Sequence, residues 1–457
     1  MKVFYHNFLK RFRNPESMYN HVSYLFLGNL VTILSQFVFA PLITRYYTPE
    51  SYGTFSAFFA AGLSLSTLLT LRYEQSLLLE ENPENRDRIA AILVTFGFYF
   101  TGLLMGVMLI DADFFSALIG ATGSSYWILL FPVFVFLNVF FLVTGVESTI
   151  AKKFRDAFVC GAPTMASSKL INLGYGYAFN GHFSGLLLGD IYLRLVYVTF
   201  RLGISLKKKL ARYFIFSLSQ LRQTVVLLVK YKRFPLYDLP AMYINMIVGQ
   251  SHIYFLTALK QHMVLGWVGI SFALLDAPLR LISYSVSPVL MHRATVMRDQ
   301  MPEFRKLLIR VVTGIYLVAL LPSAILFFWG GEIFSFVFGS QWAMSGLIVS
   351  SFIFFYTFRF EYDILDNIMS VLGLQKSKLL VYVVEGFTRI SLLIITWLIL
   401  RDPLQTIITW AYECAIVYFF VTMYAYRLLH LRMSRLLVLK TMISILFLGA
   451  YFFKHVW

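Results

Sequence analysis

The residues of this sequence with the most chemical potential are charges that fall inside long apolar runs. Four pairs combine an acid and a base four residues apart: Asp190 and Arg194, Asp276 and Arg280, Arg359 and Asp363, and Glu385 and Arg389. This spacing places both side chains on one face of a helix. A charge at the centre of a bilayer costs on the order of 3 kcal/mol or more, so it needs a partner, a cavity or a function. Each pair either neutralises itself and holds helices together or, as four pairs in one chain favour, lines a hydrated and charged interior.

Two further charges have no opposite charge near them on their own apolar run. Lys169 lies in a run rich in small residues, and Glu413 lies about two turns inside the last predicted span. An isolated carboxylate in a low dielectric favours its neutral form and could carry a proton, so Glu413 is the candidate ion-coupling residue. An isolated ammonium needs an anionic ligand or an acid from another helix, so Lys169 is a candidate for substrate binding. For both residues, pairing across helices is the alternative.

The sequence that carries these charges predicts an all-α polytopic membrane protein. The 457 residues are 59% apolar and only 14% charged, with a mean hydropathy of +0.72, whereas soluble domains are about 25% charged. The apolar runs of about 18 to 25 residues have the length that crosses a bilayer as a helix. They predict twelve spans, near residues 22–43, 52–71, 89–110, 126–146, 159–179, 183–204, 234–259, 265–291, 309–329, 345–372, 379–400 and 406–428. One more segment, 436–453, is interrupted by Lys440 and either spans the membrane or lies at its surface.

The spans group into two lobes of six that enter the membrane with the same polarity, as in a parallel pseudo-repeat. The predicted parts are a basic arm (1–20), a first lobe (21–204), a basic linker (205–233), a second lobe (234–428) and a basic turn with an apolar segment (429–457).

Placement of the basic residues predicts the orientation. Most of the 39 Lys and Arg lie on the side of the N-terminus, whereas the other side has Arg45, Lys260, Arg401 and Lys454. Short loops keep Lys and Arg in the cytoplasm, so the N-terminus is predicted to be cytoplasmic. The linker interleaves basic and apolar residues, and we expect it to lie on anionic lipid headgroups.

Several kinds of chemistry have no signature in the sequence. We find no Gly-rich phosphate loop, no metal-type spacing of His or Cys, and no nucleophile elbow. No predicted outward loop has room for a catalytic domain. We therefore expect no ATP site, no metal, no cofactor, no enzymatic activity and no nucleic-acid partner. Cys160 and Cys414 are expected to be core thiols, and Gly102 with Gly106 is expected to form a helix-packing face.

Five stretches, in this order and spacing, resemble the polysaccharide transporter family of lipid-linked oligosaccharide flippases. They are Phe37–Gly53, Leu71–Glu74, Tyr231–Leu236, Pro278–Val289 and Phe338–Trp342. The family is part of the superfamily of multidrug, oligosaccharidyl-lipid and polysaccharide exporters. The resemblance implies two six-helix lobes around a central cavity that opens alternately to either side, lined mainly by the first two helices of each lobe.

The resemblance also implies a function and a site. Known members move undecaprenyl diphosphate that carries an O-antigen or capsule repeat unit, so we expect an ATP-independent flippase in a bacterial inner membrane. A polysaccharide polymerase and a chain-length regulator are candidate partners. The residues implied to meet the substrate are Arg45, Arg72, Glu74, Asp238, Asp276 and Arg280. The alternatives are a membrane enzyme of polysaccharide assembly, such as a polymerase or acyltransferase, and a drug exporter of the same superfamily.

Overall fold

In the computed structural model the described residues are almost entirely helical. The structure describes residues 18–119, 125–151, 153–214, 218–297 and 300–431. These residues divide into two compact units, 1–270 and 271–457. The boundary lies inside one long helix, whereas the sequence predicted a division at the linker 205–233. The difference arises because the segments that follow the linker contact the first unit's helix α3.

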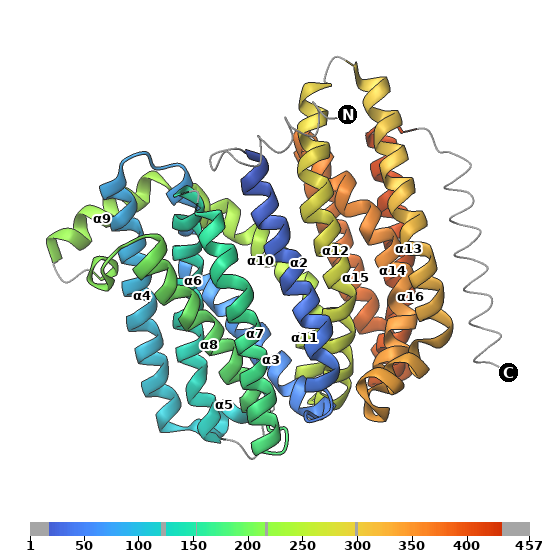
Figure 1. Ribbon diagram of the computed structural model, residues 1–457, viewed down its shortest axis with the longest axis horizontal. Coiled ribbons are helices and arrows are strands. Elements are labelled where there is room, and N and C mark those ends of the chain that lie inside the picture. The colour runs from blue at the N-terminus through green and yellow to red at the C-terminus, as the bar shows by residue number, and fades with distance from the viewer. Residues whose placement is uncertain (1–17, 120–124, 152, 215–217, 298–299, 432–457) are drawn as a thin grey trace, which may run out of the picture. The chain divides into compact units, whose positions relative to one another are not determined.

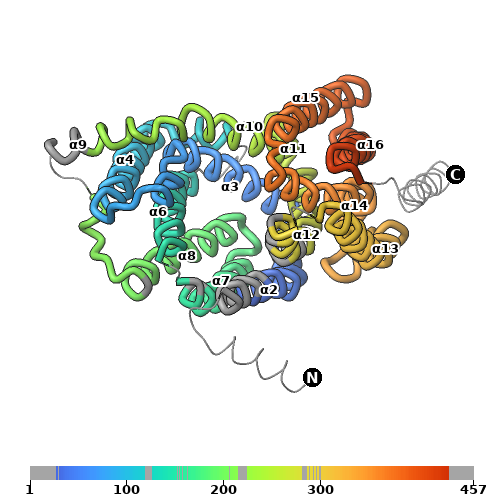
Figure 2. Tube along the Cα trace, turned by 90° about the horizontal axis from the view of Figure 1, so that it is seen from above, coloured from blue at the N-terminus to red at the C-terminus, as the bar shows by residue number. Residues whose placement is uncertain are grey.

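The first unit contains most of the predicted first lobe, the linker and the segments that follow it (Figure 1). Its helices are α2 (Met18–Ile43), α3 (Pro49–Thr70), η1 (Tyr73–Leu78), α4 (Pro83–Ile110), α5 (Ala112–Ile119), η2 (Ser125–Leu129), α6 (Leu130–Ile150), α7 (Phe154–Ala178), α8 (Ser184–Phe200), η3 (Arg201–Ser205), η4 (Leu210–Tyr213), α9 (Leu218–Lys230), η5 (Phe234–Asp238), α10 (Leu239–Gly249) and α11 (Ser251–Ala258). Helix α6 packs against α3, α4 and α8, and α7 packs against α2 and α8. Figure 2 shows these helices end-on.

The second unit begins within α12 (His262–Val296). It continues with α13 (Met301–Phe338), η7 (Ser340–Trp342), α14 (Ala343–Val371), α15 (Gln375–Leu400) and α16 (Pro403–Leu428). Helix α14 packs against α13, α15 and α16. Aromatic side chains fill much of this packing, and Phe352 contacts both Phe355 and Trp410.

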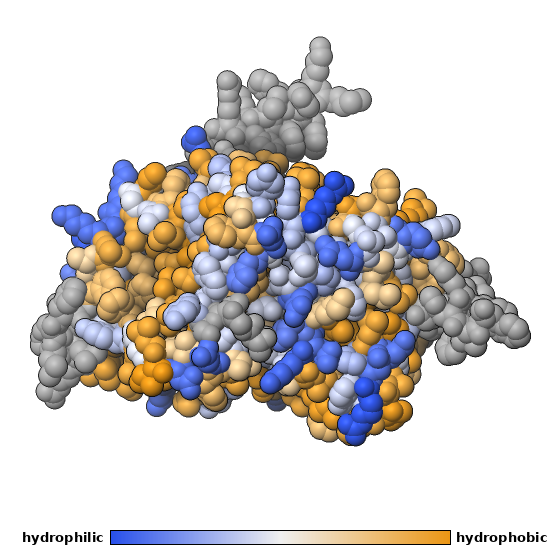
Figure 3. Space-filling view, turned by 90° about the horizontal axis from the view of Figure 1, so that it is seen from below, coloured by the Kyte–Doolittle hydropathy of each residue, from blue (hydrophilic) through white to orange (hydrophobic). Residues whose placement is uncertain are grey.

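All twelve predicted spans coincide with helices in the described part of the chain. Eight segments are long and apolar enough to cross a membrane: Pro49–Thr70, Pro83–Ile110, Tyr126–Ile150, His262–Leu279, Met301–Phe338, Ser340–Val371, Gln375–Leu400 and Pro403–Leu428. The chain is therefore a multi-pass membrane protein. Figure 3, which views the helices from one end, shows hydrophobic and hydrophilic side chains mixed on that face. The segment 436–453 lies outside the described residues.

The helix starts follow the capping chemistry in the sequence. The side chains of Thr48 and Asn82 accept hydrogen bonds from the backbone N–H groups of Ser51 and Glu84, and proline occupies the first helical position after each. Proline loses no intrahelical hydrogen bond there, since the first N–H groups of a helix have no carbonyl partner.

Two sequence expectations about helix shape are corrected. The seventh predicted span, 234–259, is a π-turn (η5) followed by α10 and α11, with a break at Gln250. Pro235 and Pro240 cannot donate backbone hydrogen bonds in the first turns of this segment, which disfavours one regular helix. A Cβ atom added to Gly102 or Gly106 would meet no atom within 4 Å among the described residues, so these glycines form no packing face with the described part of the chain.

Candidate functional site

The backbone at the end of α3 has an unusual conformation that positions Arg72. Leu71 and Arg72 both adopt left-handed conformations, with φ of 48° and 62°. Non-glycine residues occupy this region at a cost of about 1–3 kcal/mol each, and such residues concentrate at functional sites. The turn reverses the chain from α3 into η1 and directs the guanidinium of Arg72 towards the start of the α10 segment.

The side chain of Arg72 joins two carboxylates from distant parts of the sequence. Its Nε donates to Oδ2 of Asp238 at 2.8 Å, and its Nη1 donates to Oε1 of Glu74 at 3.2 Å. The exposed fractions of the side chains are 20% for Arg72, 2% for Glu74 and 44% for Asp238. We call these three residues the Arg72 cluster. It joins η1 to η5, and its most accessible member is Asp238.

Glu74 is the buried member of the cluster. Burial raises the pKa of its carboxyl above the usual range, although hydrogen bonding and the charge of Arg72 oppose this effect. Its second oxygen, Oε2, is buried without a hydrogen bond. A buried carboxylate needs a neighbouring cation, and the bond from Arg72 supplies it for Glu74.

A second contact attaches the end of the linker to the segment that follows η1. Lys230 Nζ and the Tyr231 hydroxyl donate to Oε2 of Glu80 at 2.9 and 2.8 Å. These two bonds lower the pKa of Glu80 to about 2. The short segment from Arg72 to Glu80 is therefore bonded at both ends to residues at or after the end of α9.

The start of the linker is attached to the same unit by another ionic network. Lys208 Nζ donates to Asp87 at 2.5 Å and to Glu147 at 2.7 Å, and the Tyr213 hydroxyl donates to Glu147. Burial disfavours the charge on Lys208, but its bonds to the two carboxylates outweigh this and raise its pKa.

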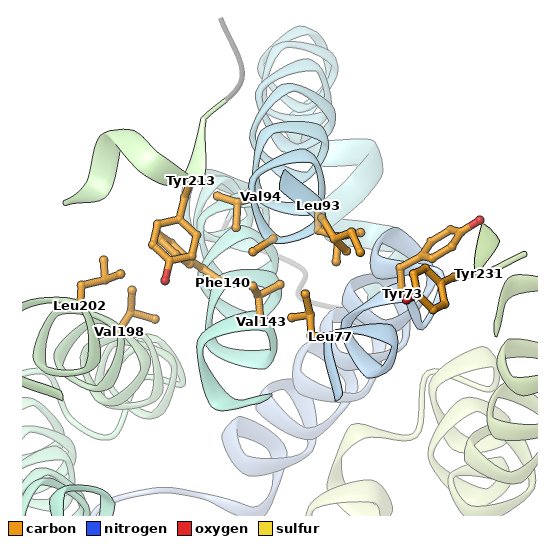
Figure 4. Close-up of a cluster of buried hydrophobic side chains, with 12 residues drawn as sticks. Tyr73, Leu77, Leu93, Val94, Phe140, Val143, Val198, Leu202, Tyr213 and Tyr231 are labelled. Atoms are coloured by element: carbon orange, nitrogen blue, oxygen red, sulfur yellow. The ribbon is translucent and has the colours of Figure 1, made fainter. Parts of the chain in front are cut away.

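Two linker tyrosines also pack into the apolar core of the first unit. Figure 4 shows Tyr213 beside Phe140 and Tyr231 beside Tyr73, at opposite sides of the same buried cluster. The rings of Phe140 and Tyr213 are 5.0 Å apart. The linker is thus folded onto the first unit at both of its ends.

The other end of α3 makes a close helix crossing with the start of α12. A Cβ atom on Gly53 would overlap the carbonyl group of His262, and one on Gly266 would overlap that of Pro49. Between the two ends of α3, the Ser64 hydroxyl is hydrogen-bonded to that of Tyr254 on α11. Segments that follow the linker therefore contact α3 at both of its ends. The contact is made by Gly53 at the start of the helix and by the Arg72–Asp238 ion pair just after its end.

The structure brings together only part of the predicted substrate site. Arg45 is exposed in the turn before α3, and the 22 residues of α3 separate it from Arg72 by about 33 Å. Arg72, Glu74 and Asp238 form the cluster described above, and Arg45 is not part of it.

Lys169 lies near a second ionic group, inside the first unit. Asp190 and Arg194 of α8 form an ion pair within one helix. Arg194 Nε also donates to Asn138 Oδ1 of α6 at 2.9 Å, and its guanidinium lies 4.5 Å from the ring centre of Phe134. Lys169 of α7 interacts electrostatically with Asp190. The acid that the sequence left open for Lys169 therefore comes from the neighbouring helix.

In the second unit, Arg359 pairs with an acid of another helix. Asp276 accepts from the Tyr356 hydroxyl at 2.7 Å and from Arg359 Nη1 at 3.3 Å. The ion pair of Arg359 is therefore with Asp276 of α12, whereas the sequence predicted Asp363 on its own helix. Arg280 lies in α12, and its side chain is outside the described part.

The remaining intramembrane charges lie on α15 and α16. Glu385 Oε1 accepts from Arg389 Nη1 at 3.1 Å, and both side chains are buried. Trp410 donates from its indole to the Arg389 carbonyl at 2.9 Å. Oε1 of Glu413 accepts from the Thr396 hydroxyl at 2.8 Å, whereas its Oε2 is buried without a hydrogen bond. The described residues contain no His, Cys, Asp and Glu group that could hold a metal ion.

The attachment of the linker was missed from the sequence. Its signal was present, because residues 205–233 contain no acid while Glu80, Asp87 and Glu147 lie at the predicted cytoplasmic ends of nearby helices. An excess of basic residues in a linker fits anionic lipid and carboxylates of the same protein equally well, so composition alone does not distinguish the two partners.

Comparison with known proteins shows the fold. No family model and no curated protein matches the chain. The lipid II flippase MurJ in an inward closed conformation has a TM-score of 0.62 at 11% identity, over 96% of this chain and 99% of that one. An inward-facing multidrug resistance MATE family transporter of the MOP superfamily has a TM-score of 0.62 at 12% identity, over 90% and 100%. A MOP superfamily transporter from Pyrococcus furiosus has a TM-score of 0.52 at 13% identity, over 90% and 96%. The chain has the fold of these transporters.

Proposed function

We propose that this protein is a flippase that moves a lipid-linked oligosaccharide across a membrane by alternating access without ATP. The observation that carries the proposal is the Arg72 cluster. In it, the guanidinium of Arg72 is bonded to Asp238, an accessible carboxylate that an anionic substrate could replace. The expected substrate has a diphosphate headgroup, such as undecaprenyl diphosphate carrying an O-antigen or capsule unit. Phosphate oxygens match the donor geometry of a guanidinium.

In the proposed mechanism, the diphosphate replaces Asp238 as the partner of Arg72. Asp238 is the accessible member of the cluster, with 44% of its side chain exposed, while the buried Glu74 keeps Arg72 in place. Loss of the Arg72–Asp238 bond frees the end of α3 from η5. Substrate capture and separation of these two segments are thus one event.

In this mechanism the Arg72–Asp238 bond closes one side of the protein, and the contact at the start of α3 closes the other side. The contact of Gly53 with the start of α12 brings two backbones together, so no side chain has to rearrange before it closes or opens. With the orientation predicted from the basic residues, the Arg72 cluster lies on the cytoplasmic side and the glycine contact on the periplasmic side of a bacterial inner membrane.

A drug exporter is the second candidate. MATE transporters match the chain with the same TM-score as the lipid II flippase does. The Arg72 cluster also contains two carboxylates for one arginine, and a cationic drug could take the place of Arg72 beside them.

Reconstituted protein distinguishes the two candidates. We expect proteoliposomes to move a fluorescent polyprenyl diphosphate glycan, measured by bleaching of the outer leaflet with dithionite, and not to transport ethidium. Arg72→Ala should lower the glycan rate at least tenfold, because a charge-assisted contact is lost. Arg88→Ala, which removes an exposed arginine outside the cluster, should leave the rate unchanged. Ethidium transport without glycan movement would establish the drug exporter.

A further inference from the structure

Helix α9 presents an apolar face that no described residue covers. Val225, Val226 and Val229 have exposed fractions of 48%, 69% and 57%. Their spacing places them on one side of the helix. Figure 1 shows α9 running crosswise to α4.

The opposite side of α9 is fixed to the first unit. Thr224 is fully buried, and Leu227 and Leu228 pack against the core cluster that contains Tyr231. The bonds of Lys230 and Tyr231 to Glu80 hold the end of the helix. The valine face therefore has a fixed direction and cannot turn inward without breaking these contacts.

The charges around this face have one sign. The linker contains no acid, and three of its basic residues, Lys208, Arg212 and Lys230, form ion pairs with carboxylates of the first unit. Four more are exposed and have no such pair: Lys207, Lys209, Lys232 and Arg233. Exposed apolar side chains with exposed basic ones are typical of helices that lie in the interface of an anionic membrane.

We propose that α9 and its flanking residues form a binding surface for anionic phospholipids. The valines enter the acyl boundary and the exposed basic residues contact the headgroups, while Glu80, Asp87 and Glu147 hold the linker against the first unit. The acids of this unit therefore determine which basic residues face the lipid. The proposal does not depend on what the protein transports.

Site-specific fluorescence in nanodiscs tests this surface. Both native cysteines are free and buried, so Val226→Cys can be labelled selectively with an NBD maleimide, with the unsubstituted protein as the blank. Glu84→Cys is the matched control, since Glu84 is exposed in the first turn of α4. In phosphatidylcholine nanodiscs containing phosphatidylglycerol, we expect the probe at 226 to be several-fold less accessible than that at 84 to a water-soluble quencher.

The lipid charge provides the decisive comparison. Protection at 226 should fall in nanodiscs of phosphatidylcholine alone, and it should also fall when Lys207, Lys209 and Lys232 are all replaced by glutamine. Quenching at 226 as strong as at 84 would overturn the proposal. Equal protection in neutral and anionic nanodiscs would overturn it as well, since the apolar face alone would then account for binding.

Discussion

The side chains of Arg72 and Asp238 meet at 2.8 Å although 166 residues separate them in the sequence. The bond connects the end of α3 with the segment that precedes α10. Arg72 reaches it from a left-handed backbone conformation that the neighbouring bond to Glu74 helps to hold. This one bond therefore reports whether the two segments are together or apart.

The substitution Gly53→Ala should weaken the contact between the start of α3 and the start of α12. The added Cβ overlaps the His262 carbonyl group, and backbone on both sides cannot move away as a side chain could. We expect a cysteine at Ser56, which lies near Gly269 on the same crossing, to react faster with a membrane-impermeant maleimide in this variant. Gly102→Ala is the matched control, because its Cβ would meet no described atom. Equal labelling in the two variants would show that the crossing is not a closed gate.

Glu80→Gln should loosen the linker in a pH-dependent way. Bonds from Lys230 and Tyr231 lower the pKa of Glu80 from 4.5 to about 2. Because the folded pKa is below the unfolded one, the stabilisation is complete above pH 4.5 and is lost as the pH falls towards 2. Thermal unfolding should therefore separate wild type from Glu80→Gln by a constant margin between pH 5 and 8, and this margin should shrink as the pH falls below 4.5. A margin that changes within that range would contradict the assignment.

Glu385→Gln should destabilise the second unit strongly. It leaves the buried guanidinium of Arg389 without its carboxylate, and breaking such a pair costs about 3–5 kcal/mol. The double variant Glu385→Gln with Arg389→Met should lose less, because neither charge is then left alone. Unfolding temperatures of the wild type, of Glu385→Gln, of Arg389→Met and of the double variant in detergent measure the difference. If the losses simply add, the two residues do not act as a pair.

For Glu413 we predict that the acid couples transport to protons. Glutamine can still accept the hydroxyl of Thr396 through its amide oxygen, so Glu413→Gln should fold and insert normally. Stimulation of glycan movement by a proton gradient should disappear, whereas Glu303→Gln, at an exposed acid of α13, should retain it. An unchanged response to the gradient would leave Glu413 a structural residue.

The membrane fold followed from the sequence because bilayer thickness imposes one length on every span. The caps at Thr48 and Asn82 are equally local, because each depends only on residues of the first helical turn. Pairing of charges was harder to predict. The spacing of Asp190 and Arg194 was sufficient because their own helix brings them together.

Charges whose partners lie on other helices could not be assigned from spacing. Asp276 meets Arg359 and Tyr356 because α12 and α14 lie side by side. Which helices are neighbours cannot be predicted from a single sequence. Arg72 and Asp238 were both candidates, but their bond depends on two left-handed residues at the end of α3. Such conformations are rare for leucine and arginine, so no local rule predicts them.

Exchanging the charges of Arg72 and Asp238 tests the central claim most directly. The variant Arg72→Asp with Asp238→Arg keeps both charges but moves the cation from α3 to the η5 segment. If Arg72 binds the diphosphate, glycan movement in proteoliposomes should stay at least tenfold below wild type although the protein folds and reconstitutes normally. Recovery of the wild-type rate by the swapped pair would contradict the account, because Arg72 would then serve only to hold Asp238.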